Sequence, residues 1–273
     1  MSYDYWASNT ERNLMVMDRG ELDVAIAAFE ANLARAPTIF GQRSVYVISE
    51  NNRLAQALIR KGDHARARPY VETALRLSAQ VLGKDSYNYS VVTETAAQLA
   101  QAQGERAAAE TSYREALAVR TAAIGGDHPD SLDLELQLGL LLAAQGNADG
   151  DAMVQRAHDL WLPRIPAGSA NGIRLQQGWA EWLIAKHRLD EAAQTLETVQ
   201  PLLLDSPYAA VRQQVLGARL AEQRGNRSEA VQYWQAAVAA AGPLYGKTSA
   251  VTLQWRGALQ AARDHVQGGG ALP

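Results

Sequence analysis

The chain has 273 residues, no cysteine and a formal net charge of −3. The lack of cysteine excludes disulfides, thiolate metal sites and a cysteine nucleophile, and the lack of a strongly basic segment argues against DNA or RNA as a partner. Residues that favour helices are abundant, whereas there are only nine prolines and two phenylalanines. The composition therefore predicts an all-α protein without a nucleic-acid ligand.

The N-terminal stretch MSYDYWASNTER has neither the basic nor the apolar region of a signal peptide. The longest apolar run, LGLLLAA at 138–144, is far too short to cross a bilayer. We therefore expect a cytoplasmic protein with no membrane partner.

Glycines recur along the chain at a constant interval. Gly20, Gly62, Gly104 and Gly146 are each separated by 42 residues. An alanine follows the first three glycines by five residues, and a bulky apolar residue follows that alanine by four, which places both on one helix face. The same pattern returns after KHRLDEA and RGNRSEA, and Gly150, Val154 and Ala157 give a further copy if the turn after Gly146 is one residue shorter, so six copies are expected. Five of the copies have the alanine and the bulky residue at the regular spacing. These pairs are Ala25 and Phe29, Ala67 and Val71, Ala109 and Tyr113, Ala192 and Leu196, and Ala230 and Trp234.

A second kind of turn contains the stretch AIGGDHPDSL at 123–132. Its Ile-Gly pair has counterparts at Phe40-Gly41, Leu82-Gly83 and Tyr245-Gly246. We interpret it as a helix end with a left-handed glycine, followed by a new helix that Asp127 or His128 caps and whose first turn contains Pro129.

Two helices separate successive turns of the same kind, so each copy is a helical hairpin. The segment TAAQLAQAQGERAAAETSYREAL resembles the tetratricopeptide repeat, and the 42-residue period with the GGDHPDS turn resembles the longer variant of kinesin light chains. The resemblance implies a right-handed α-solenoid of about six repeats with a C-terminal capping helix. The expected organisation is one domain over 1–266, with repeats near 2–41, 44–83, 86–125, 128–166, 169–204 and 207–245, a cap at 248–266, and a disordered tail at 267–273.

The first helix of each hairpin has an apolar stripe, such as Leu54, Ala55 and Leu58, that is expected in the core. Its opposite face lines the concave side of such a stack and is polar. These polar side chains either bind a peptide or simply solvate an exposed face. Two arginines in the set favour a partner with acidic residues. The predicted groove residues are Asn52, Gln56, Arg60, Glu94, Gln98, Gln101, Arg174, Gln177 and Glu181.

No residue pattern indicates catalysis or metal binding. Asp127, His128 and Ser131 are residue types of a nucleophilic triad, but no nucleophile-elbow sequence accompanies them and the repeat already explains them. The five histidines show no ligand spacing, so neither a metal nor a cofactor is predicted. Helical spacing favours core packing for the tryptophans, of which Trp182 is the least explained.

The leading hypothesis is a non-enzymatic scaffold that binds a peptide or a partner's helix in its groove, and self-association is left open. One alternative is the regulatory or sensory part of a larger signalling protein such as a bacterial kinase. The repeat register begins at Ser2, aligned with Ser44 and Ser86, which suits a domain cut from a longer chain and equally suits a native start. Hydrolase activity is the remote alternative.

Overall fold

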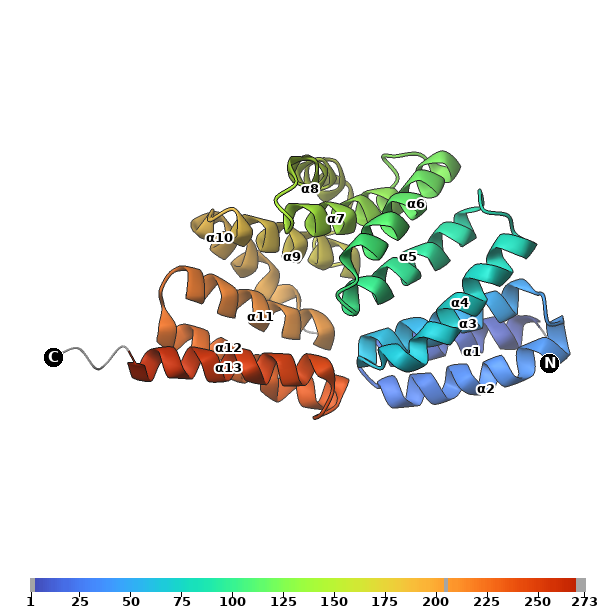
Figure 1. Cartoon of the computed structure of the whole chain (residues 1–273), viewed down its shortest axis with the longest axis horizontal. Helices are drawn as coiled ribbons and strands as arrows, with labels where there is room; N and C mark the ends of the chain where they lie inside the picture. The colour runs from blue at the N-terminus through green and yellow to red at the C-terminus, as the bar shows by residue number, and fades with distance from the viewer. Residues whose placement is uncertain (1–2, 204–205, 269–273) are drawn as a thin grey trace. The chain divides into compact units, whose positions relative to one another are not determined.

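The computed structural model describes residues 3–203 and 206–268, and within them the chain forms thirteen α-helices and no strand (Figure 1). Two short 3₁₀ helices, η1 (Leu162–Arg164) and η2 (Gln200–Leu202), continue α8 and α10. The helices are α1 (Tyr3–Asp18), α2 (Leu22–Phe40), α3 (Val45–Lys61), α4 (His64–Val81), α5 (Tyr87–Ala102), α6 (Arg106–Ile124), α7 (Pro129–Ala143), α8 (Ala148–Trp161), α9 (Ala170–Ala185), α10 (Leu189–Val199), α11 (Pro207–Gln223), α12 (Arg227–Tyr245) and α13 (Ala250–Gly268).

Serine side chains cap the N-termini of several of the first helices. Ser44 Oγ accepts a hydrogen bond from the Val47 backbone N–H at 3.4 Å, and Ser86 Oγ accepts one from Tyr89 N–H at 3.2 Å. Each bond satisfies a backbone donor that has no partner within the helix. Ser169 and Ser206 cap α9 and α11 in the same way.

The turns between the two helices of a hairpin need a residue with positive φ. Gly62 has φ 81° and ψ 12°, the left-handed conformation that glycine adopts without strain. His187 stands where the repeat would place a glycine, and it adopts φ 57° at the equivalent turn.

The turn after α6 differs from the sequence-based expectation. Gly125 has φ 91° and ψ 149°, so its φ is positive but its ψ lies outside the left-handed helical region. This conformation is essentially restricted to glycine, and it directs the chain out of the helix into an extended segment. His128 is the N-cap of α7, and its Nδ1 accepts a hydrogen bond from Asp130 N–H at 3.2 Å.

The chain divides into two compact units, residues 1–153 and 154–273, with the boundary inside α8. We refer to them as unit 1 and unit 2. The prediction of a single domain over 1–266 stays a prediction. The cap helix α13 ends at Gly268, two residues beyond its predicted end, and the rest of the predicted tail lies outside the described residues.

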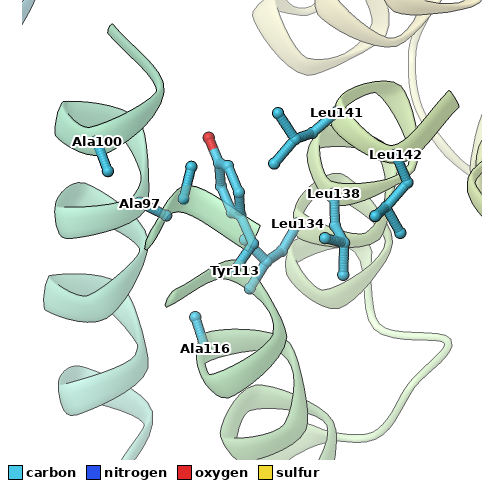
Figure 2. Close-up of a cluster of buried hydrophobic side chains, with 9 residues drawn as sticks. Ala97, Ala100, Tyr113, Ala116, Leu134, Leu138, Leu141 and Leu142 are labelled. Carbon is cyan, nitrogen blue, oxygen red and sulfur yellow. The ribbon is translucent and has the colours of Figure 1, made fainter. Parts of the chain in front are cut away.

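The core of unit 1 follows the predicted pattern. Tyr113 on α6 is 1 % exposed, and Figure 2 shows its ring between the alanines of α5 and the leucines of α7. Phe29 and Val71, its counterparts in the two preceding hairpins, are also buried. The large side chain of each second helix thus fills the space beside small residues of its neighbours.

In unit 2 the corresponding position on α12 is Trp234, which packs with Val215 of α11 and with Leu259 of α13. A second cluster joins Ile173 of α9 to Val199 of α10. The repeat pattern therefore determines which side chains are buried in both units.

Candidate functional site

The nine predicted groove residues lie on three first helices. Asn52, Gln56 and Arg60 are on α3, and Glu94, Gln98 and Gln101 are on α5, all in unit 1. Arg174, Gln177 and Glu181 are on α9 in unit 2.

In unit 1, amide side chains connect neighbouring first helices. Gln56 Nε2 of α3 donates to Thr95 Oγ1 of α5 at 3.1 Å. Gln98 Nε2 of α5 donates to Gln137 Oε1 of α7 at 3.3 Å, and also to Glu94 Oε1 at 3.1 Å. These half-buried glutamines therefore stabilise the stack in addition to facing its surface.

Glu94 is the centre of this polar network. Its Oε1 accepts a hydrogen bond from Gln137 Nε2 at 3.2 Å, and its Oε2 lies 2.8 Å from Nη2 of Arg120. Arg120 is on the second helix α6, is 3 % exposed, and also donates to Ser90 Oγ and to the Asp130 carbonyl oxygen. The buried guanidinium thus joins α5, α6 and α7.

Arg120 and Gln137 were not among the predicted site residues. The positions 42 and 84 residues before Arg120 hold Ser78 and Ala36, so the repeat pattern predicts a small residue there. A buried arginine in a small-residue position is itself the sequence signal that could have pointed to the network.

Gln101 is exposed at the end of α5, and its Oε1 accepts a hydrogen bond from the Tyr113 hydroxyl at 2.9 Å. Burial raises the pKa of Tyr113, and the carboxylates of Glu94 and Asp133 raise it further. The hydroxyl therefore stays protonated and acts as a donor at the edge of the network.

Asn52 differs from the other residues of this set. Its side chain is 6 % exposed, and its Oδ1 is buried without a hydrogen-bond partner. It borders a cavity of about 60 Å³ between the N-terminal halves of α3 and α5. The other lining residues are Val45, Ile48, Ser49, Leu82, Asn88, Val91 and Val92.

A buried carbonyl oxygen without a donor costs free energy, on the order of 1–3 kcal/mol, unless a ligand or water supplies one. Val45 is 43 % exposed and Asn88 is exposed, so the rim of the cavity is accessible. The cavity can therefore receive a small apolar group together with an N–H or O–H donor.

Arg60, at the last turn of α3, is exposed and pairs with Asp18 of α1, with Nη1 and Oδ1 2.8 Å apart. A carboxylate of a ligand would compete with Asp18 for this guanidinium. An exposed pair of this kind contributes little to stability, about 0–1 kcal/mol, so Asp18 is a weak competitor.

In unit 2, the predicted residues again link first helices. Gln177 is 1 % exposed, and its Nε2 donates to the Ala209 carbonyl oxygen of α11 at 2.8 Å and to Gln213 Oε1 at 3.2 Å. The sequence pattern placed Gln177 on the open polar face of its helix. In the structure Gln177 is instead buried at the α9–α11 junction, where it has a structural role. Arg174 is exposed and donates to Asn171 Oδ1 at 2.9 Å.

Glu181 lies between two arginines of α11. Its Oε2 is 3.0 Å from Nη2 of Arg212, and its Oε1 is 2.9 Å from Nη1 of Arg219. Burial disfavours the charged form of Glu181, but the two guanidinium groups outweigh burial and hold its pKa below the ordinary value. This cluster has one more positive than negative charge among its three members.

Comparisons with known proteins agree with this geometry. A family model described as tetratricopeptide repeat matches residues 46–122, which span α3 to α6. These residues therefore match the tetratricopeptide repeat, and the chain has the fold of a tetratricopeptide-repeat solenoid. No protein with a curated description matches its sequence.

Solved structures share the tetratricopeptide-repeat fold at low sequence identity. A crystal structure of nearly identical TPR-like repeats from a putative kinesin light chain of Podosopora anserina is 17 % identical to this chain with a TM-score of 0.55, and the match covers 72 % of this chain and 93 % of that one. A substituted form of that protein gives 16 % identity, a TM-score of 0.56, and coverage of 74 % and 97 %. BtubC (BKLC) from P. vanneervenii is 14 % identical with a TM-score of 0.51, and covers 92 % and 94 %.

The GGDHPDS turn connects α6 to α7 and provides the N-cap of α7. Ser131 is 0 % exposed and its Oγ has no hydrogen-bond partner, so His128 does not activate it.

Among the described residues, no three histidine or carboxylate side chains come together to hold a metal ion. No helix in the described part of the chain has the length and apolarity needed to cross a membrane.

Two tryptophans of α9 in unit 2 form a stack of aromatic rings with His158 of α8. Trp182 is 7 % exposed and stacks on Trp179 with ring centroids 4.7 Å apart, and Trp179 stacks on His158 at 4.0 Å. The Arg188 guanidinium lies 5.6 Å from the Trp182 ring centroid. Stacking thus accounts for Trp182, the tryptophan that the sequence pattern explained least.

Proposed function

We propose that the protein is a non-catalytic interaction module in which the first helices of unit 1 bind an extended peptide of a partner protein. The observation that carries this proposal is the unpartnered Oδ1 of Asn52 beside the cavity between α3 and α5. In a repeat stack of this kind the first helices line the concave side, where extended peptides bind.

The chemistry of the cavity defines what the peptide offers. Asn52 Oδ1 needs a donor, and an extended backbone presents an N–H at every residue other than proline. Val45, Ile48 and Val91 border the same cavity, so a small aliphatic side chain next to that N–H completes the fit. The peptide therefore anchors at Asn52 through its backbone and through one small apolar residue.

Arg60 supports a second contact further along α3. Its guanidinium is exposed and already holds the carboxylate of Asp18, so it has the geometry to hold a carboxylate of the peptide in exchange. Arg174 has the same potential on α9 of unit 2. The proposal thus includes acidic residues in the partner, outside the segment seated at Asn52.

Glu94, in contrast to Arg60, disfavours acidic residues of the peptide in its vicinity. Its carboxylate lies on α5 and retains partial exposure, with 17 % of the side chain accessible. Arg120 neutralises it in part, and a peptide carboxylate at this place would be repelled by the remaining field. The acidic residues are therefore expected near Arg60 and not near Glu94.

The test is peptide selection followed by calorimetry. A display library of random peptides is selected on the intact protein, and the affinity of selected peptides is measured for wild type, Asn52→Ala and the control Asn226→Ala. Asn226 is an exposed asparagine in the turn before α12 in unit 2.

We expect Asn52→Ala to weaken binding about three- to tenfold, the net value of one hydrogen bond, while Asn226→Ala has no effect. Thermal unfolding of each variant confirms that folding is preserved. If every selected peptide binds Asn52→Ala as tightly as wild type, the site lies elsewhere and the proposal is wrong.

A further inference from the structure

The junction between the first hairpin and α3 is polar at positions where the next junctions are apolar. Three buried positions of unit 1 recur at the 42-residue period, and in the second and third junctions all of them hold alanine, valine or leucine. Figure 2 shows the third set beside Tyr113. The three sets are Asn13, Asn32 and Glu50, then Ala55, Ala74 and Val92, and then Ala97, Ala116 and Leu134.

Glu50 is the centre of the first set and is 0 % exposed. Its Oε1 accepts a hydrogen bond from Thr10 Oγ1 of α1 at 3.3 Å and lies 3.2 Å from Nη1 of Arg53. Its Oε2 accepts one from Asn32 Nδ2 of α2 at 3.4 Å. The carboxylate on α3 therefore connects to both helices of the first hairpin.

These hydrogen bonds and the Arg53 pair do not fully replace the apolar packing that the next two junctions have at these positions. The bonds from Thr10 and Asn32 are long, and Nδ2 of Asn13 is buried without a hydrogen-bond partner. A buried polar group in this state destabilises the closed arrangement relative to one in which water reaches it. We therefore expect the first junction to be weaker than the two that follow it.

The charge state of Glu50 affects this junction. Burial raises its pKa, and Arg53, Asn32, Thr10 and Trp6 oppose burial only in part. Thr10 and Trp6 of α1 and Asn32 of α2 contact the carboxylate without charge, so within the described part of the chain Arg53 is the cation that pairs with it.

The other charged groups that connect the hairpin to α3 and α4 are exposed ion pairs. They join α1 to α3, α2 to α3, and α2 to α4, and salt screens such pairs. The pairs are Asp18–Arg60, Asp23–Lys61 and Glu30–Arg66.

We propose that the α1–α2 hairpin undocks from α3 as one unit while the following helices of unit 1 stay folded. The hairpin is a proton-linked latch, because the Glu50 carboxylate sets the balance between its docked and undocked states. Undocking brings Glu50 into water, where it ionises readily. Protonation of Glu50 therefore favours the docked state, and undocking increases as the pH rises through the range in which the buried carboxyl would ionise. This inference stands independently of the peptide site.

Hydrogen exchange measured by mass spectrometry on the intact protein tests the latch. After correction for intrinsic rates, amides of α1 and α2 are expected to exchange at least about tenfold faster than those of α4 and α5 at about pH 8, with the difference narrowing towards about pH 5. Glu50→Gln removes the ionisation and is expected to remove this pH dependence. The control Glu110→Gln, at an exposed pair on α6, is expected to retain it.

A second variant copies the next junction into the first. Asn13→Ala, Asn32→Ala and Glu50→Val together reproduce Ala55, Ala74 and Val92, and we expect exchange of α1 and α2 to slow by about tenfold at about pH 8. Ordinary fraying of a terminal helix would not depend on Glu50. Equal exchange in the first hairpin and in α4–α5, or a pH dependence that persists in Glu50→Gln, would overturn the proposal.

Discussion

Replacing Tyr113 with alanine tests the packing on which the repeat depends. Its ring is 1 % exposed and contacts alanines of α5 and leucines of α7. A buried aromatic side chain removes roughly 150–200 Å² from water, which at about 25 cal/mol per Å² is about 4–5 kcal/mol. Incomplete collapse of the cavity gives a similar range, and we expect Tyr113→Ala to lower the free energy of unfolding of unit 1 by about 3–5 kcal/mol.

Urea unfolding followed by far-ultraviolet circular dichroism measures this loss, with each transition fitted separately if the two units unfold apart. Tyr113→Phe keeps the ring and removes the hydroxyl, which donates to Gln101 Oε1 at 2.9 Å and lies 3.4 Å from Gln137 Oε1, so it should cost about 0.5–1.5 kcal/mol. Val24→Ala is the control, since Val24 is 56 % exposed and its loss should change stability by less than about 0.5 kcal/mol. A loss below about 1 kcal/mol for Tyr113→Ala would refute the packing argument.

Three further predictions concern turns and charges. His128→Ala should cost about 0.5–1 kcal/mol through the lost cap of α7, whereas Ser131→Ala, which removes a buried hydroxyl without a partner, should be neutral or stabilising, and differential scanning calorimetry separates the two. Gly125→Ala should cost about 1–3 kcal/mol in the same assay, because alanine tolerates φ 91° with ψ 149° poorly, and an unchanged melting temperature would contradict this. Glu181→Gln should destabilise unit 2 by up to about 1 kcal/mol at neutral pH, because the two arginine pairs stabilise the carboxylate. The difference in stability between wild type and Glu181→Gln should disappear as the pH falls from the ordinary glutamate range through the lowered pKa of Glu181. A constant difference down to about pH 2 would be inconsistent with the Arg212 and Arg219 pairs.

Much of the fold follows from the sequence because buried positions recur at a fixed interval. Gly62 and Tyr113 occupy the turn and the core as their spacing predicts. The conformation of Gly125 was not predictable in the same way, because a glycine after a helix indicates positive φ without fixing ψ. His187 shows that the turn conformation is retained when the glycine is replaced.

The site was less predictable because its properties depend on which helices meet. Helical spacing placed Gln98 and Gln177 on the polar face, but it could not distinguish the half-buried Gln98 from Gln177, which is buried against α11. Arg120 reaches Glu94 from a second helix, and no pattern within one helix indicates that contact. The unpartnered Oδ1 of Asn52 likewise emerges only when α3 and α5 are packed together.

The contact between Asn52 and a peptide backbone N–H is tested most directly by a double-mutant cycle. A selected peptide is N-methylated at one residue at a time, and each form is titrated calorimetrically into wild type and Asn52→Ala. We predict one position at which methylation weakens binding to wild type by about 1 kcal/mol more than binding to Asn52→Ala, since only the wild type has the bond to lose. Equal losses in both proteins at every position would contradict a backbone donor at Asn52 and with it the proposed peptide site.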